Sequence, residues 1–268
     1  MDKEKYVHGY SHKESARLSD QAETLTEFLH TGTRYPAGSD VLEAGCGVGA
    51  QTVILAKNSP HARFTSIDIS RESVEKARLL VEKDKITNVK FQAADLFELP
   101  FEKECFDHIF VCFVLEHLKE PLKALNCLKE VLKKGGSMTV IEGDHGSTCF
   151  YPESKEAQRV IQCQVDIQSS MQGNSLIGRQ VYPLLNKAGF KIIEVSPKMI
   201  YVDGSRPVLI EGFTKKTFIA MIEGVKNQAL EMRLIDEKTW QKGISDLYRT
   251  AAPDGIFCYT FFKGVAIK

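Results

Sequence analysis

Long apolar segments are absent from this sequence of 268 residues. No stretch approaches the roughly 20 apolar residues that a membrane-spanning helix needs, so we expect no membrane span. Residues 1–5 are mostly charged and lack the apolar core of a secretory signal. An excess of one charge is also missing, because 35 Lys and Arg balance 35 Asp and Glu. The sequence therefore predicts no overall attraction to nucleic acid or anionic lipid.

Paired-cysteine motifs and repeats are missing as well. The seven cysteines are odd in number and include no C-x-x-C, which favours buried, reduced thiols over a metal or redox cluster. Reduced thiols indicate a reducing compartment, so we expect a cytoplasmic protein without a metal site. The composition, 43% apolar and 26% charged, is typical of globular proteins.

Short apolar runs alternate with helical patterns from residue 41 onward. The predicted strands are 41–44, 64–69, 89–94, 106–114, 138–142, 190–202 and 257–267. Runs that are apolar at nearly every position, separated by helices, are typical of a parallel sheet covered on both faces. The sequence therefore predicts an α/β protein with a doubly wound, mostly parallel, seven-stranded sheet.

Helix-boundary signals agree with this order. The capping box Ser11-His12-Lys13-Glu14 predicts the start of an N-terminal helix that ends near Gly32. Ser70 can cap the helix after the second strand. Pro121 suits the first turn of a later helix, which we predict to end at Gly135-Gly136.

The chain divides into three predicted segments: an N-terminal helical lid at 1–37, a cofactor-binding α/β core at 38–145, and a completion of the sheet at 146–268. Residues from about 178–203 and 257–268 supply the last strands. Two helical insertions, about 146–177 and 204–256, interrupt the sheet, and strand signal is weak between about residues 143 and 177. We expect these insertions to form a lid on the substrate side.

The most informative stretch, residues 41–50, reads Val-Leu-Glu-Ala-Gly-Cys-Gly-Val-Gly-Ala. A strand, a glycine turn and a helix bring backbone N–H groups and a positive helix terminus close to a ligand. The spacing of Gly45, Gly47 and Ala50 also satisfies the dinucleotide fingerprint G-x-G-x-x-[G/A]. Glu43 favours a different ligand, because a carboxylate there would repel a pyrophosphate but attract an ammonium or sulfonium.

Ionisable residues follow the carboxyl ends of five predicted strands: Glu43, Asp68, Asp95, Glu116 with His117, and Glu142 with Asp144 and His145. Asp68 is placed to accept both hydroxyls of a ribose, and Asp95 is placed to receive the exocyclic amine of an adenine. In open α/β sheets this edge is where ligands bind. The clustering predicts a ligand site there.

Together these motifs resemble the class I S-adenosylmethionine-dependent methyltransferase superfamily. The matching stretches are Glu43–Gly49 (E-x-G-x-G-x-G), Ile67–Ser70, Ala94–Leu96, Phe113–Leu118 and Leu132–Gly136. The run V-L-E-H-L is similar to the small-molecule branch that includes ubiquinone/menaquinone-biosynthesis-type enzymes. The resemblance, which covers about residues 38–145, implies a Rossmann-like methyltransferase fold, S-adenosylmethionine as cofactor with S-adenosylhomocysteine as product, and a small-molecule acceptor.

The resemblance also implies which residues bind the cofactor. They are Tyr10, Arg17, Glu43, Gly45, Cys46, Gly47, Gly49, Asp68, Ile69, Ala94, Asp95, Leu96, Phe113 and Val114. The glycine loop would hold the methionine portion, and the residues at the ends of strands two and three would hold the ribose and adenine. Phe113 and Val114 would line the floor near the sulfonium. Tyr10 and Arg17 would close over the cofactor.

Methyl transfer from a sulfonium is an in-line displacement that depends on placing the acceptor and excluding water. A general base is required only when the acceptor must lose a proton. Glu116, His117 and His145 are candidates, and the sequence selects none of them. Six side chains from the second half of the chain are candidates either for the surface that meets an aromatic or lipid-like acceptor or for the core of the insertions. They are Phe150, Tyr151, Met171, Tyr201, Trp240 and Phe257.

Two other functions stay open at this point. The glycine spacing alone is compatible with an NAD(P)-dependent oxidoreductase. A non-catalytic protein that binds S-adenosylmethionine would carry the same motifs. The methyl acceptor, the target atom and the oligomeric state cannot be read from the chain.

Overall fold

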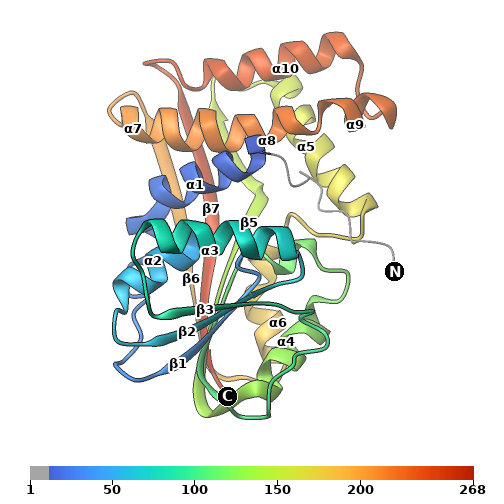
Figure 1. Ribbon diagram of the computed structural model, residues 1–268. Helices are drawn as coiled ribbons and strands as arrows, with labels where there is room; N and C mark the ends of the chain where they lie inside the picture. Colours follow the sequence, from blue (N-terminus) through green and yellow to red (C-terminus); the bar gives the residue numbers. More distant parts are fainter. Residues whose placement is uncertain (1–11) are drawn as a thin grey trace. The chain divides into compact units, whose positions relative to one another are not determined.

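Seven strands form one sheet in the computed structural model, which describes residues 12–268 (Figure 1). The strands are β1 (Asp40–Ala44), β2 (Arg63–Asp68), β3 (Val89–Ala93), β4 (Phe106–Cys112), β5 (Leu132–Tyr151), β6 (Lys191–Asp203) and β7 (Ile256–Ile267). Their order in the sheet is β3-β2-β1-β4-β5-β7-β6. The predicted seven-stranded α/β fold is confirmed.

Strand direction follows from the pairing. β1 pairs in parallel with both β2 and β4, β2 with β3, and β4 with β5. β7 runs antiparallel to β5, because Gly135 N donates to Lys268 O at one end (3.1 Å) and Thr260 N donates to Ser147 Oγ (2.9 Å) farther along β5. The chain therefore reverses its strand order between β1 and β4, and ligands of open α/β sheets bind at such a switch point.

Helices connect these strands. They are α1 (His12–His30), α2 (Ala50–Asn58), α3 (Arg71–Lys83), α4 (Pro121–Val131), α5 (Lys155–Ser170), α6 (Val181–Lys187), α7 (Pro207–Leu209), α8 (Ala220–Gly224), α9 (Lys226–Glu231) and α10 (Glu237–Arg249). Two 3₁₀ helices, η1 (Leu115–His117) and η2 (Ile177–Gln180), and a π-helix, η3 (Ile210–Ile219), complete the set. None of the helices within residues 12–268 has the length and apolarity that crossing a bilayer demands.

The chain forms two compact units. The core unit comprises Thr26–Gly143, Ile177–Lys198 and Phe262–Lys268. The insertion unit comprises the described residues up to Leu25 together with Asp144–Leu176 and Met199–Phe261. The strands β5, β6 and β7 contribute residues to both. That the N-terminal segment and the insertions act as a lid stays a prediction.

Local signals in the sequence explain where several helices begin and end. Ser70 caps α3 by accepting a hydrogen bond from Ser73 N (3.2 Å), and Pro121 occupies the first turn of α4, both as predicted. The first helix ends at His30, close to the predicted stop. Ser11, in the predicted capping box, lies outside the described residues.

Two predictions around β5 were wrong. α4 ends at Val131 and not at Gly135-Gly136, because Leu132 already begins β5 and pairs with Phe106. β5 also continues past the predicted end at Glu142 as far as Tyr151. Hydrogen bonds from β7 hold both extensions, and a partner strand more than a hundred residues away leaves no signal in the local sequence.

Lys263 is a buried charge that the sequence analysis missed. From β7 its Nζ donates to Leu29 O (3.2 Å), Thr31 O (2.9 Å) and Thr33 Oγ1 (2.6 Å), which ties the end of α1 to the sheet. Burial lowers the pKa of the ammonium to about 8. The three acceptors supply part of the solvation that burial removes.

A substitution at Gly49 tests whether close packing against α3 constrains the loop before α2. Its φ is +85°, and a Cβ added there would lie 2.9 Å from Ala77 Cα on α3. We expect Gly49→Ala to lower the free energy of unfolding by about 2–4 kcal/mol, because backbone strain and a clash with main-chain atoms add together. Urea unfolding measures this change.

Gly47→Ala is the matched control. Gly47 also has a positive φ, +53°, but a Cβ there meets nothing within 4 Å. This variant should lose only about 1 kcal/mol, the cost of the left-handed conformation alone. Equal losses in the two variants would contradict the proposed packing of Gly49 against α3.

Candidate functional site

A tight glycine loop, Gly45–Gly49, joins the end of β1 to α2 in the core unit. Gly45, Gly47 and Gly49 all have positive φ, which L side chains rarely adopt. Gly45 N (2.8 Å) and Cys46 N (2.9 Å) both donate to Ile67 O on β2. A Cβ at Gly45 would clash with the side chain of Val114. The loop is therefore held against the ends of two neighbouring strands.

Glu43 lies buried beneath this loop, with 2% of its surface exposed. Its Oε2 accepts hydrogen bonds from Thr52 Oγ1 and Ser66 Oγ, both at 2.6 Å. Burial raises the pKa of Glu43 to about 7, the two hydroxyls oppose this rise, and the nearby charge of Asp68 adds to it. A cation bound close by would favour the ionised form.

Asp68, at the end of β2, connects the loop to the next helix. Its Oδ2 accepts from Gly47 N and its Oδ1 from Ser70 N, each at 2.9 Å. Burial raises the pKa of this carboxyl, whereas the two amide hydrogen bonds lower it. The carboxylate that we predict to meet a ribose thus also shapes the glycine loop.

The end of β3 lies beside Asp68, because Ala94 N donates to Asp68 O (3.0 Å). Asp95 is half-buried, and its Oδ1 accepts from Phe97 N (2.8 Å). Ile69 is 57% exposed, which leaves its side chain accessible to a flat ring. The structure brings together the residues predicted to bind the ribose and the adenine.

Glu142 holds the turn that follows β4. Its Oε1 accepts from Val114 N (3.0 Å) and Leu115 N (2.8 Å), and its Oε2 is buried without a hydrogen-bond partner. Burial raises the pKa of Glu142 well above its usual range, and the charge of Glu116 adds to the rise. Phe113, at the start of this turn, is a non-glycine residue with φ +56°. The buried carboxyl thus supports a strained turn at the functional edge.

The three candidate bases fall in both units. Glu116 and His117 lie in η1 of the core unit, with His117 Nε2 3.5 Å from Glu116 Oε1. His145 lies in the insertion unit, where its Nδ1 is 3.0 Å from Tyr259 OH and its ring packs against Phe218 with 42° between the ring planes. The structure groups Glu116 and His117 with the glycine loop in one unit. It describes His145 as part of a buried aromatic cluster.

The two N-terminal candidates have different outcomes. Arg17 lies in α1 within the insertion unit, is buried, and donates to Gln21 Oε1 (3.1 Å). Tyr10 lies outside the described residues. Their contact with a cofactor stays a prediction.

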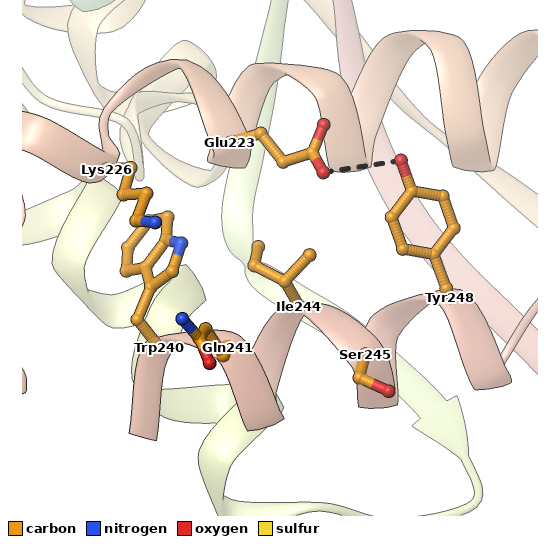
Figure 2. Close-up of a pocket in the computed structure, with 7 residues that line it drawn as sticks. All are labelled: Glu223, Lys226, Trp240, Gln241, Ile244, Ser245 and Tyr248. Carbon is orange, nitrogen blue, oxygen red and sulfur yellow. Dashed lines mark hydrogen bonds between the residues drawn. The ribbon is translucent and has the colours of Figure 1, made fainter. Parts of the chain in front are cut away.

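The apolar side chains proposed for the acceptor divide by burial. Phe150, Trp240 and Phe257 are buried in the insertion unit, whereas Tyr151 and Tyr201 are exposed. A pocket of about 610 Å³ lies among α8, α9 and α10, and its lining residues are Glu223, Lys226, Trp240, Gln241, Ile244, Ser245 and Tyr248. Figure 2 shows Tyr248 OH donating across it to Glu223 Oε1 (3.4 Å). Among residues 12–268, none of those predicted to bind the cofactor lines this pocket.

Two partners of Glu43 escaped the sequence analysis. Ser66 is the residue paired with Glu43 in the β1–β2 register, so a correct strand alignment could have found it. Thr52 lies in the first turn of α2, nine residues after Glu43, where only the loop geometry brings it back. Buried acids usually have hydrogen-bond donors, so a search for nearby serine and threonine hydroxyls could have identified both residues.

Comparisons with known proteins find a matching family model and methyltransferases among the relatives. A family model described as a methyltransferase domain matches residues 36–189. The chain is 35% identical over 133 residues to an uncharacterized methyltransferase of Schizosaccharomyces pombe, across 47% of this chain and 48% of that protein. It is 36% identical over 109 residues to a demethylmenaquinone methyltransferase of Staphylococcus aureus, across 39% and 43% of the two chains.

A solved structure shows the same fold. Phosphoethanolamine N-methyltransferase 2 of Haemonchus contortus, in complex with phosphomonomethylethanolamine and S-adenosylhomocysteine, superposes with a TM-score of 0.58 at 20% identity. The match covers 92% of this chain and 52% of that one. The chain thus spans about half the length of the Haemonchus contortus enzyme and of the Schizosaccharomyces pombe relative.

Glu43 should make stability depend on pH. A folded-state pKa of about 7, above the ordinary 4.5, means that the folded protein binds the proton more tightly than the unfolded chain. The stability that protonation supplies is complete below about pH 4.5 and is lost as pH rises through 7. We expect this loss to reach roughly 3 kcal/mol at most. Glu43→Gln keeps an acceptor oxygen but does not titrate, so its unfolding free energy should fall less between pH 5 and 8. Parallel curves for the two proteins would contradict the prediction.

Glu142 can be tested with a matched pair of variants. Glu142→Ala removes the acceptor of two backbone N–H groups and should lower the free energy of unfolding by about 2–4 kcal/mol. Glu142→Gln retains an oxygen for the same two groups and should lose less than about 1 kcal/mol. Urea unfolding at neutral pH distinguishes them, and similar losses in both would show that the hydrogen bonds are not what Glu142 contributes.

Proposed function

We propose that this chain transfers a methyl group from S-adenosylmethionine to a small-molecule acceptor. The premise is that the chain belongs to the methyltransferase-domain family, whose model matches residues 36–189. The observation that carries this proposal is the arrangement in the core unit of a buried acid, a left-handed glycine loop and a second acid at adjacent strand ends. These are Glu43, Gly45–Gly49 and Asp68.

The residues present fit the proposed cofactor. A side chain at Gly47 would meet no other atom within 4 Å, so the loop leaves open space where the methionine portion would lie. The two acids that flank the loop suit a ligand whose sulfonium and ammonium are positive. Asp68 and Asp95 lie on adjacent strand ends and would accept from the ribose and the adenine. When bound, S-adenosylmethionine supplies an electrophilic methyl group and a thioether leaving group.

The oxidoreductase alternative fits less well. A dinucleotide would place its diphosphate at the glycine loop, directly above the buried carboxyl of Glu43. Asp68 already raises the pKa of Glu43, so a further negative charge would be unfavourable there. The family membership points the same way.

The chain's own residues would contribute positioning more than acid–base chemistry. Glu142 holds the turn that carries Phe113 and Val114, which we propose as the floor near the reacting methyl group. A rigid floor fixes the distance and angle of attack, on which an in-line displacement depends. Glu116 and His117, on the same turn, are placed to receive a proton if the acceptor is a hydroxyl.

The acceptor is proposed only as a class. The demethylmenaquinone methyltransferase among the relatives supports a small organic acceptor, and the aromatic side chains of the insertion unit support an aromatic or apolar one. We do not expect a nucleic acid as partner, because the charges balance. The free thiols of all seven cysteines support a cytoplasmic location.

Binding of S-adenosylhomocysteine tests the proposed site. Calorimetric titration should give one site in the full chain, and Asp68→Asn should weaken it at least about tenfold, or roughly 1.4 kcal/mol, through the loss of a charged hydrogen bond. Asp84→Asn is the control, because Asp84 lies in the same unit and pairs with Lys57 (2.7 Å) away from the loop. This variant should bind as the wild type does.

The outcomes separate the three functions. Methyl transfer to a small molecule from an acceptor panel, measured with isotopically labelled cofactor, supports the proposal. Binding without transfer to any acceptor would favour a cofactor-binding protein. Stabilisation by NAD(H) and none by S-adenosylhomocysteine would overturn the proposal.

A further inference from the structure

Two cysteines face each other across β5 and β7 in the insertion unit. The register of the two strands is visible on both sides of them: Thr260 N donates to Ser147 Oγ (2.9 Å), and the rings of Phe150 and Phe257 stack at 6.5 Å with 7° between their planes. β7 runs antiparallel to β5, so the residue before Phe150 lies opposite the residue after Phe257. These two residues are Cys149 and Cys258.

The two thiols lie close enough to influence each other, because the neighbouring Cys149 thiol raises the pKa of the Cys258 thiol. Facing residues of antiparallel strands have Cα atoms about 4.5–5.5 Å apart. Disulfides need about 4.4–6.8 Å. Facing positions on antiparallel strands are therefore compatible with a bond between the two sulfurs.

The two cysteines differ in accessibility. Cys149 is exposed and Cys258 is buried. Burial raises the pKa of the Cys258 thiol to about 11, and the neighbouring Cys149 adds to this rise. A soluble oxidant would therefore meet Cys149 first, and Cys258 would be the second thiol to react.

We propose that Cys149 and Cys258 are a thiol pair that oxidised glutathione converts into a reversible cross-strand disulfide. The Cys149 thiolate attacks one sulfur of glutathione disulfide and displaces the first glutathione thiolate, which gives a mixed disulfide. The Cys258 thiolate then attacks the Cys149 sulfur and displaces the second glutathione. Two cysteine thiols are oxidised, one disulfide is reduced, and the two protons go to the released thiolates. This proposal is independent of the methyl-transfer function.

The link would act on the insertion unit. It would close the chain between residues 149 and 258, which includes α5 and α10, so the unfolded chain would lose conformational freedom. The oxidised protein should therefore unfold at a higher temperature than the reduced protein, and dithiothreitol should restore the lower value.

Mass spectrometry of the full chain tests the pair. The protein is incubated with oxidised glutathione, alkylated, and digested without reductant. We expect one linked species that joins the peptides containing residues 149 and 258 and disappears after dithiothreitol. Cys258→Ala should instead retain glutathione on Cys149, and Cys149→Ser should show neither the link nor an adduct on Cys258.

Cys127→Ser is the matched control, because Cys127 is a half-buried cysteine in α4 of the core unit. This variant should form the same link as the wild type. Glutathione that stays on Cys149 in the wild type, or a link from Cys149 to another cysteine, would overturn the proposal. If Cys258→Ala fails to fold, the exposed Cys149→Ser variant and the wild type still decide the question.

Discussion

The core unit depends on the left-handed loop between β1 and α2. Three glycines adopt positive φ within five residues, and two of them approach neighbouring atoms too closely for any side chain. Ile67 O accepts two amides of the loop, and Asp68 accepts a third. The loop is therefore a backbone structure held by its own amides, and it leaves open space at Gly47 near the acids at the strand ends.

The structure tolerates the buried acids around this loop because protein hydroxyls and amides donate hydrogen bonds to them in place of water. Glu43 is held by two hydroxyls, Asp68 by two amides, and Glu142 by the amides of the turn after β4. Even so, burial raises the pKa of all three, so the native structure retains carboxyls that are costly to ionise. Such groups are typical of sites that meet a positive ligand, because the ligand's charge offsets part of that cost.

The parts of the structure that the sequence predicted are those that local chemistry controls. The glycine loop, the cap at Ser70 and the proline that begins α4 each follow from a few adjacent residues. The full length of β5 did not follow, because its far end is held by hydrogen bonds from β7. Lys263 and Glu142 were missed as structural residues for the same reason, since their partners lie 27 or more residues away.

This difference between local and distant control also explains why the class of the protein is readable and its acceptor is not. The residues predicted to bind the cofactor are constrained by backbone geometry, which leaves a pattern of glycines and acids in the chain. The insertion unit is organised instead by packing among Phe213, Phe218, Phe257, Tyr259 and Phe261, with His145 against Tyr259. Many apolar sequences satisfy such packing, so the side chains that would select an acceptor carry no motif.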